Sequence, residues 1–108
     1  MLNQIVLVGR IAKEIETKEV NGKKVVSLTL ACQRSWKNSN GEYDTDFFDI
    51  RLFDSIGQNV KDYCKKGDIV GIKGRLQSTT IEKYHTKMNI IEIVAEKVTF
   101  LSSKSNNE

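Results

Sequence analysis

Residues 46–53 read DFFDIRLF, and their even and odd positions differ in kind. The even positions Phe48, Ile50 and Leu52 are apolar, whereas the odd positions carry aromatic rings and charges. This two-residue alternation predicts a strand with one face in a core. The opposite face is too aromatic and too charged to be an ordinary solvated surface.

Directly after this strand, residues 55–67 read SIGQNVKDYCKKG. Here the spacing of apolar residues changes from every second residue to every third or fourth. Ser55 and Gln58 have the spacing of a capping box, and Gly67 can take the left-handed position that stops a helix. One helical face collects Ile56, Val60 and Tyr63. We therefore predict a short helix after the strand.

The rest of the chain supplies further strands on either side. Alternating or β-branched residues predict strands over 5–8, 24–34, 69–76 and 88–94, and Asn21-Gly22 predicts a hairpin turn. The order of three strands, a helix and two strands is that of an all-β, five-stranded OB-fold barrel with one short helix. Another small α+β fold fits the same pattern.

Length and composition restrict the class of protein. The chain has 108 residues, enough for one domain, with 17 basic and 14 acidic residues and a net charge of +3. No apolar run approaches the ~18 residues of a membrane span, and the start resembles no signal peptide. The separated Cys32 and Cys64 indicate reduced thiols in a cytoplasmic protein.

The odd face of residues 46–53 is the first candidate binding surface. Phe47 and Phe53 alternate there with Asp49 and Arg51. Exposed rings beside a cation form a stacking platform for bases, because every base has a π-face and phosphates attract cations. The alternative is that the two rings lie in a secondary core or a subunit interface.

Trp36 is the second candidate. It stands between Arg34 and Lys37, where the second predicted strand meets the polar loop 37–41. A ring at this place can stack a base while its neighbours hold phosphate, although a tryptophan also packs well in a core.

Residues 77–87, between the last two strands, are the third candidate. They carry Lys83, Tyr84 and Lys87, and OB folds use this connection to hold oligonucleotides. An exposed hairpin without a ligand is the alternative, and His85 is interpreted as a surface residue. Lys73 and Arg75 either face phosphates or belong to a solvated charged surface.

Catalysis finds no support in the sequence. A nucleophile and base would need a second histidine or an activated thiol, and the glycines form no phosphate-binding loop. The acidic residues are scattered, so no two-metal site is expected. We expect no enzyme and no cofactor.

Several segments together resemble the bacterial single-stranded DNA-binding proteins. The segments are MLNQIVLVGR at 1–10, LTLA at 28–31 followed by RSW at 34–36, the run 45–53, KKG at 65–67, GRLQ at 74–77 and EIVAE at 92–96. The resemblance covers residues 1–101 in order. It implies an OB-fold domain over 1–101. The polar composition of residues 102–108 predicts a flexible tail.

The resemblance also implies a homotetramer that wraps single-stranded DNA in replication, recombination or repair, in the cytoplasm with the nucleoid. The nucleic-acid-binding residues expected from pattern and resemblance are Arg10, Arg34, Trp36, Lys37, Phe47, Arg51, Phe53, Lys73, Arg75, Lys83, Tyr84 and Lys87.

The sequence departs from the family at three places. Ile81 occupies a family aromatic position, with Tyr84 three residues later, and Asp49 stands where many members have a basic or neutral residue. The acidic tip that recruits protein partners in the family is missing before Glu108, so we expect no partners of that kind.

Two other functions remain compatible with the pattern: a dimeric replication-restart factor with an OB fold, and a protein-interaction OB module whose aromatic face is a subunit contact.

Overall fold

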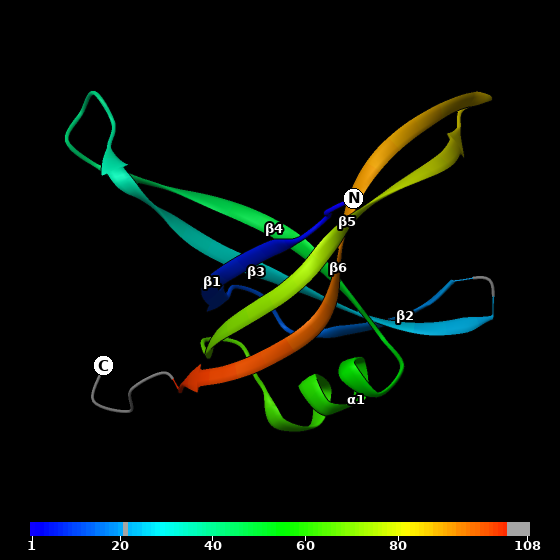
Figure 1. Ribbon diagram of the computed structural model, residues 1–108, viewed down its shortest axis with the longest axis horizontal. Helices are drawn as coiled ribbons and strands as arrows, with labels where there is room; N and C mark the ends of the chain where they lie inside the picture. Colours follow the sequence, from blue (N-terminus) through cyan, green and yellow to red (C-terminus); the bar gives the residue numbers. More distant parts are fainter. Residues whose placement is uncertain (21, 104–108) are drawn as a thin grey trace.

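The computed structural model describes residues 1–20 and 22–103 as a small β-barrel with one helix at its base (Figure 1). The elements are β1 Ile5–Ile11, β2 Glu16–Val20, β3 Lys23–Lys37, β4 Tyr43–Phe53, α1 Asp54–Tyr63, β5 Ile69–Lys83 and β6 Thr86–Ser102. From Lys104 on, the predicted tail lies outside the described residues.

Five of the strands in the described part of the chain close into a ring. The order is β1, β5, β6, β4 and β3, and β1 also pairs with β3. The pair β4–β6 is parallel and the other pairs are antiparallel. This topology confirms the predicted five-stranded OB barrel and excludes an open α+β sheet.

The core of the barrel follows the alternation seen in the sequence. Leu28 of β3 lies opposite Ile50 of β4, and both are buried together with Leu30, Leu52 and Ile72. Burying each such side chain contributes about 1.5–3 kcal/mol. The core therefore fixes which face of β4 points outward.

One strand, β2, was missed by the pattern. It pairs only with β3, from Glu16 opposite Ser27 to Val20 opposite Lys23. Its residues are mostly exposed and charged, so no hydrophobic period marks it. Gly22 has a φ of +80°, as the predicted turn requires, while Asn21 lies outside the described residues.

The predicted capping box at the start of α1 is wrong. The helix begins at Asp54, with extended Phe53 as N-cap and no side-chain hydrogen bond at the cap. Gln58 donates to Asp62 instead. The reason is geometric: β4 runs straight into the helix, so Ser55 already lies inside the first turn.

The end of α1 also differs from the prediction. The amide of Cys64 donates to the carbonyl of Val60 at the last turn. Gly67 lies beyond the end of the helix and has a φ of +98°. Its amide donates to the Ile11 carbonyl where the chain turns into β5. Tyr63, expected on the packed face, is 80% exposed.

The last two strands are much longer than predicted. β5 reaches Lys83 and β6 begins at Thr86, so the connection over 77–87 is a continuous hairpin. The β3–β4 and β5–β6 hairpin ends project from the barrel in Figure 1, and we call them the 34–45 arm and the 77–92 arm.

Candidate nucleic-acid interface

The outer face of β4 presents the aromatic and charged residues together. Because Ile50 and Leu52 are fully buried, the odd positions of the strand point away from the core. Phe47 is 65% exposed, whereas Phe53 is half-buried opposite Val25, which is itself buried. Phe47 is thus the more accessible ring for stacking.

Trp36 lies near the end of β3, on the 34–45 arm. Its side chain is 62% exposed, and the guanidinium of Arg34 lies 5.8 Å from the centre of its ring. A cation at this distance from an indole face is attracted by the ring quadrupole. The indole therefore stands on the surface with one cation already beside it.

Arg34 is committed to neighbouring carboxylates. Its Nε and Nη2 donate to Asp46 at 3.1 Å and 2.9 Å, and Asp44 lies 3.7 Å from Nη1. The hydrogen bond from Arg34 lowers the pKa of the Asp46 carboxyl, and the same pairing raises the pKa of Arg34. Arg34 therefore links β3 to β4 within the arm, and its charge is largely neutralised by the two carboxylates.

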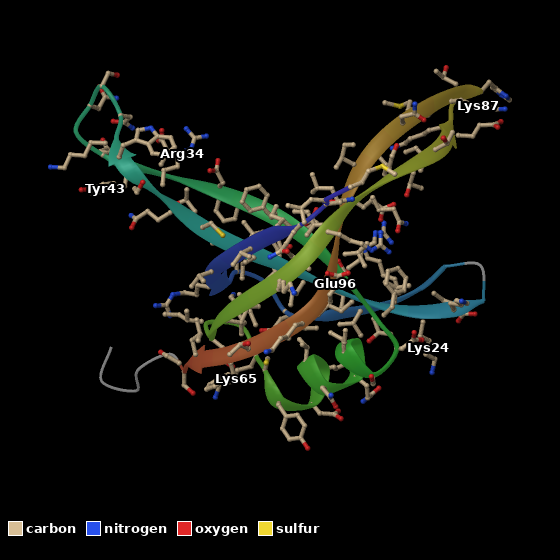
Figure 2. All side chains as sticks on the ribbon, in the orientation of Figure 1. Lys24, Arg34, Tyr43, Lys65, Lys87 and Glu96 are labelled. Carbon is tan, nitrogen blue, oxygen red and sulfur yellow. The ribbon has the colours of Figure 1, made fainter. Side chains whose placement is uncertain are left out.

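Tyr43 is a candidate that the sequence pattern missed. It lies opposite Lys37 at the start of β4, and the Lys37 ammonium is 5.9 Å from its ring. Figure 2 shows Tyr43 and Arg34 together near the end of the 34–45 arm. An aromatic residue just across a turn from Trp36 was the signal that could have identified it.

Arg51 is also paired. It forms an ion pair with Glu92 of β6, whose side chain is only 13% exposed. Arg75 lies across β6 from Arg51, since both are opposite Val94, and its Nη1 donates to Gln77 at 2.8 Å. The barrel thus brings Arg51 and Arg75 to one surface, each with a partner.

Two further predicted residues lie away from this surface. Lys73 is exposed and lies opposite Val6 of β1 and Lys97 of β6. Arg10 donates from Nη1 to the Gly67 carbonyl at 2.7 Å. Both belong to the β1 side of the barrel rather than to the aromatic face of β4.

The 77–92 arm ends in a cationic and aromatic turn. Tyr84 is 86% exposed, with the Lys83 ammonium 5.6 Å from its ring, and Lys87 lies at the same tip (Figure 2). Tyr84 and His85 both have positive φ, at 53° and 62°. Such a turn favours Asn-Gly, so two large side chains are displayed here at a conformational cost.

Ile81, for which the resemblance implies an aromatic position, is half-buried opposite Met88 on the body of this arm. Tyr84 is at the tip, so the two do not occupy equivalent places.

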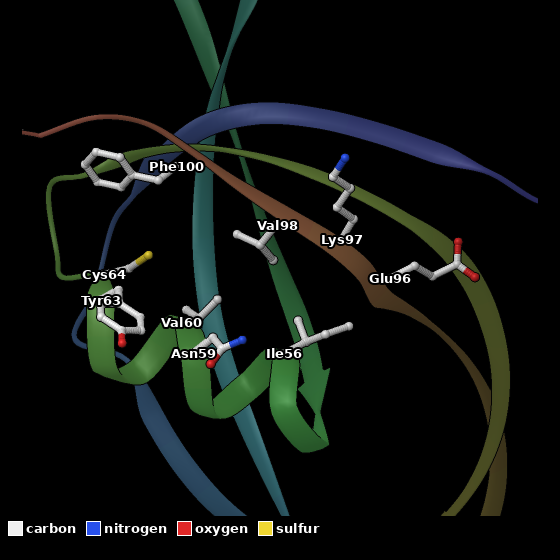
Figure 3. Close-up of a pocket in the computed structure, with 9 residues that line it drawn as sticks. All are labelled: Ile56, Asn59, Val60, Tyr63, Cys64, Glu96, Lys97, Val98 and Phe100. Carbon is white, nitrogen blue, oxygen red and sulfur yellow. The ribbon is translucent and has the colours of Figure 1, made fainter.

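An apolar cleft of about 340 Å³ lies between α1 and β6 (Figure 3). Ile56, Tyr63 and Cys64 line it from the helix side, and Val98 and Phe100 from β6. Burial, and then the nearby Asp68 carboxylate, raise the pKa of the Cys64 thiol, so this thiol is a weak nucleophile at neutral pH.

Within residues 1–20 and 22–103, no cluster of three or more His, Cys, Asp or Glu side chains is arranged to hold a metal ion. The one helix that the described residues form is too short and too polar to cross a membrane.

Comparison with known proteins agrees with this architecture. Residues 2–101 match the model of the single-strand binding protein family. Single-stranded DNA-binding protein 2 of Staphylococcus aureus (strain COL) is 40% identical over 110 residues, covering 100% of this chain and 79% of the relative. Single-stranded DNA-binding protein 3 of Listeria innocua serovar 6a is 40% identical over 108 residues, covering 98% and 68%.

A solved structure, "Plasmodium falciparum SSB complex with ssDNA", superimposes with a TM-score of 0.78 at 29% identity, covering 94% of this chain and 96% of the other. The match by sequence and the match by fold both extend over nearly the whole barrel. This chain belongs to the single-strand binding protein family.

Proposed function

We propose that this chain binds single-stranded DNA without a strict sequence requirement and protects it during replication, recombination or repair. Its binding unit is residues 1–101, and it acts in the cytoplasm, with the nucleoid, without catalysis or a cofactor. The observation that carries the proposal is the pair of exposed rings, Phe47 and Trp36, on the outer side of a barrel of this family. Proteins whose names state single-stranded DNA binding are similar over the full chain.

The phosphates are held mainly by lysines in this proposal. Arg34 and Arg51 are engaged by carboxylates, whereas the described residues form no ion pair with Lys37, Lys83 or Lys87. These lysines lie on the two arms, beside Tyr43 and Tyr84. Each arm thus combines a ring for a base with a cation for the backbone.

We further propose that the protein acts as a homotetramer, built as a dimer of dimers. Val6, Val8 and Leu101 form an exposed apolar strip, and a Cβ at Gly71 would lie 3.8 Å from Val8 and 3.7 Å from Leu101. Along one edge, β1 pairs with β5 over Ile5–Arg10, but only Arg10 and Ile11 pair with β3 on the other edge. An apolar strip beside a partly unpaired strand edge supports pairing with a second copy.

The test is a titration with oligo-dT that follows the fluorescence of Trp36, the one tryptophan of the chain. We expect quenching, and a logarithmic loss of affinity with salt of about 0.7 per phosphate contact. Phe47→Ala should weaken binding by about 5- to 150-fold, as expected for one stacked base. An unquenched Trp36 together with no measurable oligo-dT binding would refute the proposal.

A further inference from the structure

A polar groove of about 240 Å³ runs over the outer faces of β2, β3 and β4. It is lined by Ser27 and Thr29 of β3, by Asp49 and Arg51 of β4, and by Lys13 and Lys18 on the β2 side. The groove is smaller than the ~300–1,000 Å³ pockets that take drug-sized ligands, so it suits a group the size of one base.

The strand register explains the shape of the groove. Ser27 lies opposite Arg51 on one side and Glu16 on the other, and Thr29 lies opposite Asp49. The short hydroxyl side chains of β3 therefore form a floor between longer side chains on β4 and β2. Phe47 precedes Asp49 by two residues on the same face of β4, so an exposed ring stands at the rim.

The chemical character of the groove is set by Asp49. Its Oδ1 accepts a hydrogen bond from the Thr29 hydroxyl at 2.9 Å. Its other oxygen, Oδ2, has no hydrogen-bond or ion-pair partner among the described residues. The nearest cation along the strand, Arg51, is paired with Glu92. Lys18, which pairs with Glu16, and Lys13 line the groove on the β2 side. The groove thus combines an oriented carboxylate acceptor on β4 with cations on the opposite side.

A carboxylate at this place repels phosphate but accepts hydrogen bonds from amines on base edges. Cytosine and adenine carry exocyclic amines, N4 and N6, whereas thymine has a carbonyl oxygen and a methyl group in place of the cytosine amine. We propose that the groove is a base-edge subsite for an amino-bearing base, tested here with cytosine, in which the exocyclic amine donates to Asp49 while the strand continues over Phe47. This inference rests on the proposed binding of single-stranded DNA and adds a base preference to it.

The experiment compares oligo-dC and oligo-dT of equal length at one salt concentration, using wild type, Asp49→Ala and Asp49→Asn. The measured quantity is the ratio of the two dissociation constants for each protein. Differences between the free oligonucleotides cancel when the ratio of a variant is compared with that of wild type. Asp49→Ala removes the acceptor, and we expect dC binding to weaken by about tenfold relative to dT, the loss of one charge-assisted hydrogen bond.

Asp49→Asn keeps an acceptor oxygen but removes the charge. We expect it to bind both oligonucleotides more tightly, because phosphate repulsion falls. The dC to dT ratio should lie between those of wild type and Asp49→Ala, because a neutral acceptor makes a weaker hydrogen bond than a carboxylate. Glu96→Ala is the control for net charge, since Glu96 is exposed and lines the cleft between α1 and β6 instead. It should change both affinities equally.

An unchanged ratio in Asp49→Ala, with the fold verified by circular dichroism, would overturn the subsite. A wild-type protein that binds neither oligonucleotide would instead overturn the proposed function, so the two failures are distinguishable.

Discussion

Among single residues, Arg34 has a different role from the one its sequence position indicates. The pair with Asp46 holds the guanidinium beside the Trp36 ring. We predict that Asp46→Asn loosens Trp36, lowering its fluorescence anisotropy at neutral pH without unfolding the barrel. Asp44→Asn is the matched control, because Asp44 contacts Arg34 only at 3.7 Å and should have a smaller effect.

The same contact gives a dependence on pH. Because Arg34 lowers the pKa of Asp46, the pair is fully present above the usual pKa of an aspartate and is lost as the pH falls through the lowered value. We expect the Trp36 anisotropy of wild type to stay constant around neutrality and to fall only in acid. Anisotropy in Asp46→Asn equal to that of wild type at neutral pH would show that Arg34 does not position the ring.

The sequence predicted which face of a strand each side chain occupies, but it did not predict which charged residues form ion pairs. Alternation alone placed Phe47 and Arg51 on the outer side of their strand. The partner of Arg51 is Glu92, on a strand far along the chain, and no local pattern connects the two. The binding roles of these residues remain predictions.

For the elements of structure, the close approach of β5 to β6 permits a sharp test. A Cβ at Gly74 would lie 2.3 Å from the Val94 carbonyl oxygen, so the backbone would have to move. We predict that Gly74→Ala destabilises the fold by about 1–3 kcal/mol, as overpacking does. Chemical denaturation measures it, and exposed Ser78→Ala on the same strand should be nearly neutral. Equal stability of the two variants would contradict the close contact.

The elements with one buried face were predictable, and those without one were not. The middle of β3 and the second half of β4 bury alternate residues, so their period is visible. β2 and the 77–92 arm are exposed over much of their length, and their pairing is decided by backbone hydrogen bonds to a neighbouring strand. The start of α1 was misplaced because an extended residue, not a polar side chain, caps it.

For the whole molecule, the proposed tetramer depends on the outer side of β1. We predict that Val8→Asp lowers the mass measured by light scattering to that of a monomer or dimer, because a charge would be buried in the apolar strip. Ile91→Asp is the control, since Ile91 is at least as exposed as Val8 but lies on the 77–92 arm. A wild-type monomer at micromolar concentration would contradict the assembly.

The way the ring closes has a consequence for how the protein folds. Two closures are short: β1 meets β3 only at Arg10 and Ile11, and β4 meets β6 only at Ile50 and Arg51. The β1–β3 contact spans no more of the chain than the hairpins β3–β4 and β5–β6 do, whereas the β4–β6 closure joins more distant residues, Ile50 and Ile93, for few hydrogen bonds. A contact of that kind forms slowly, since loop entropy is lost before it stabilises the chain. We therefore expect the hairpins to form first, and the amides at the β4–β6 closure to become protected from hydrogen exchange last.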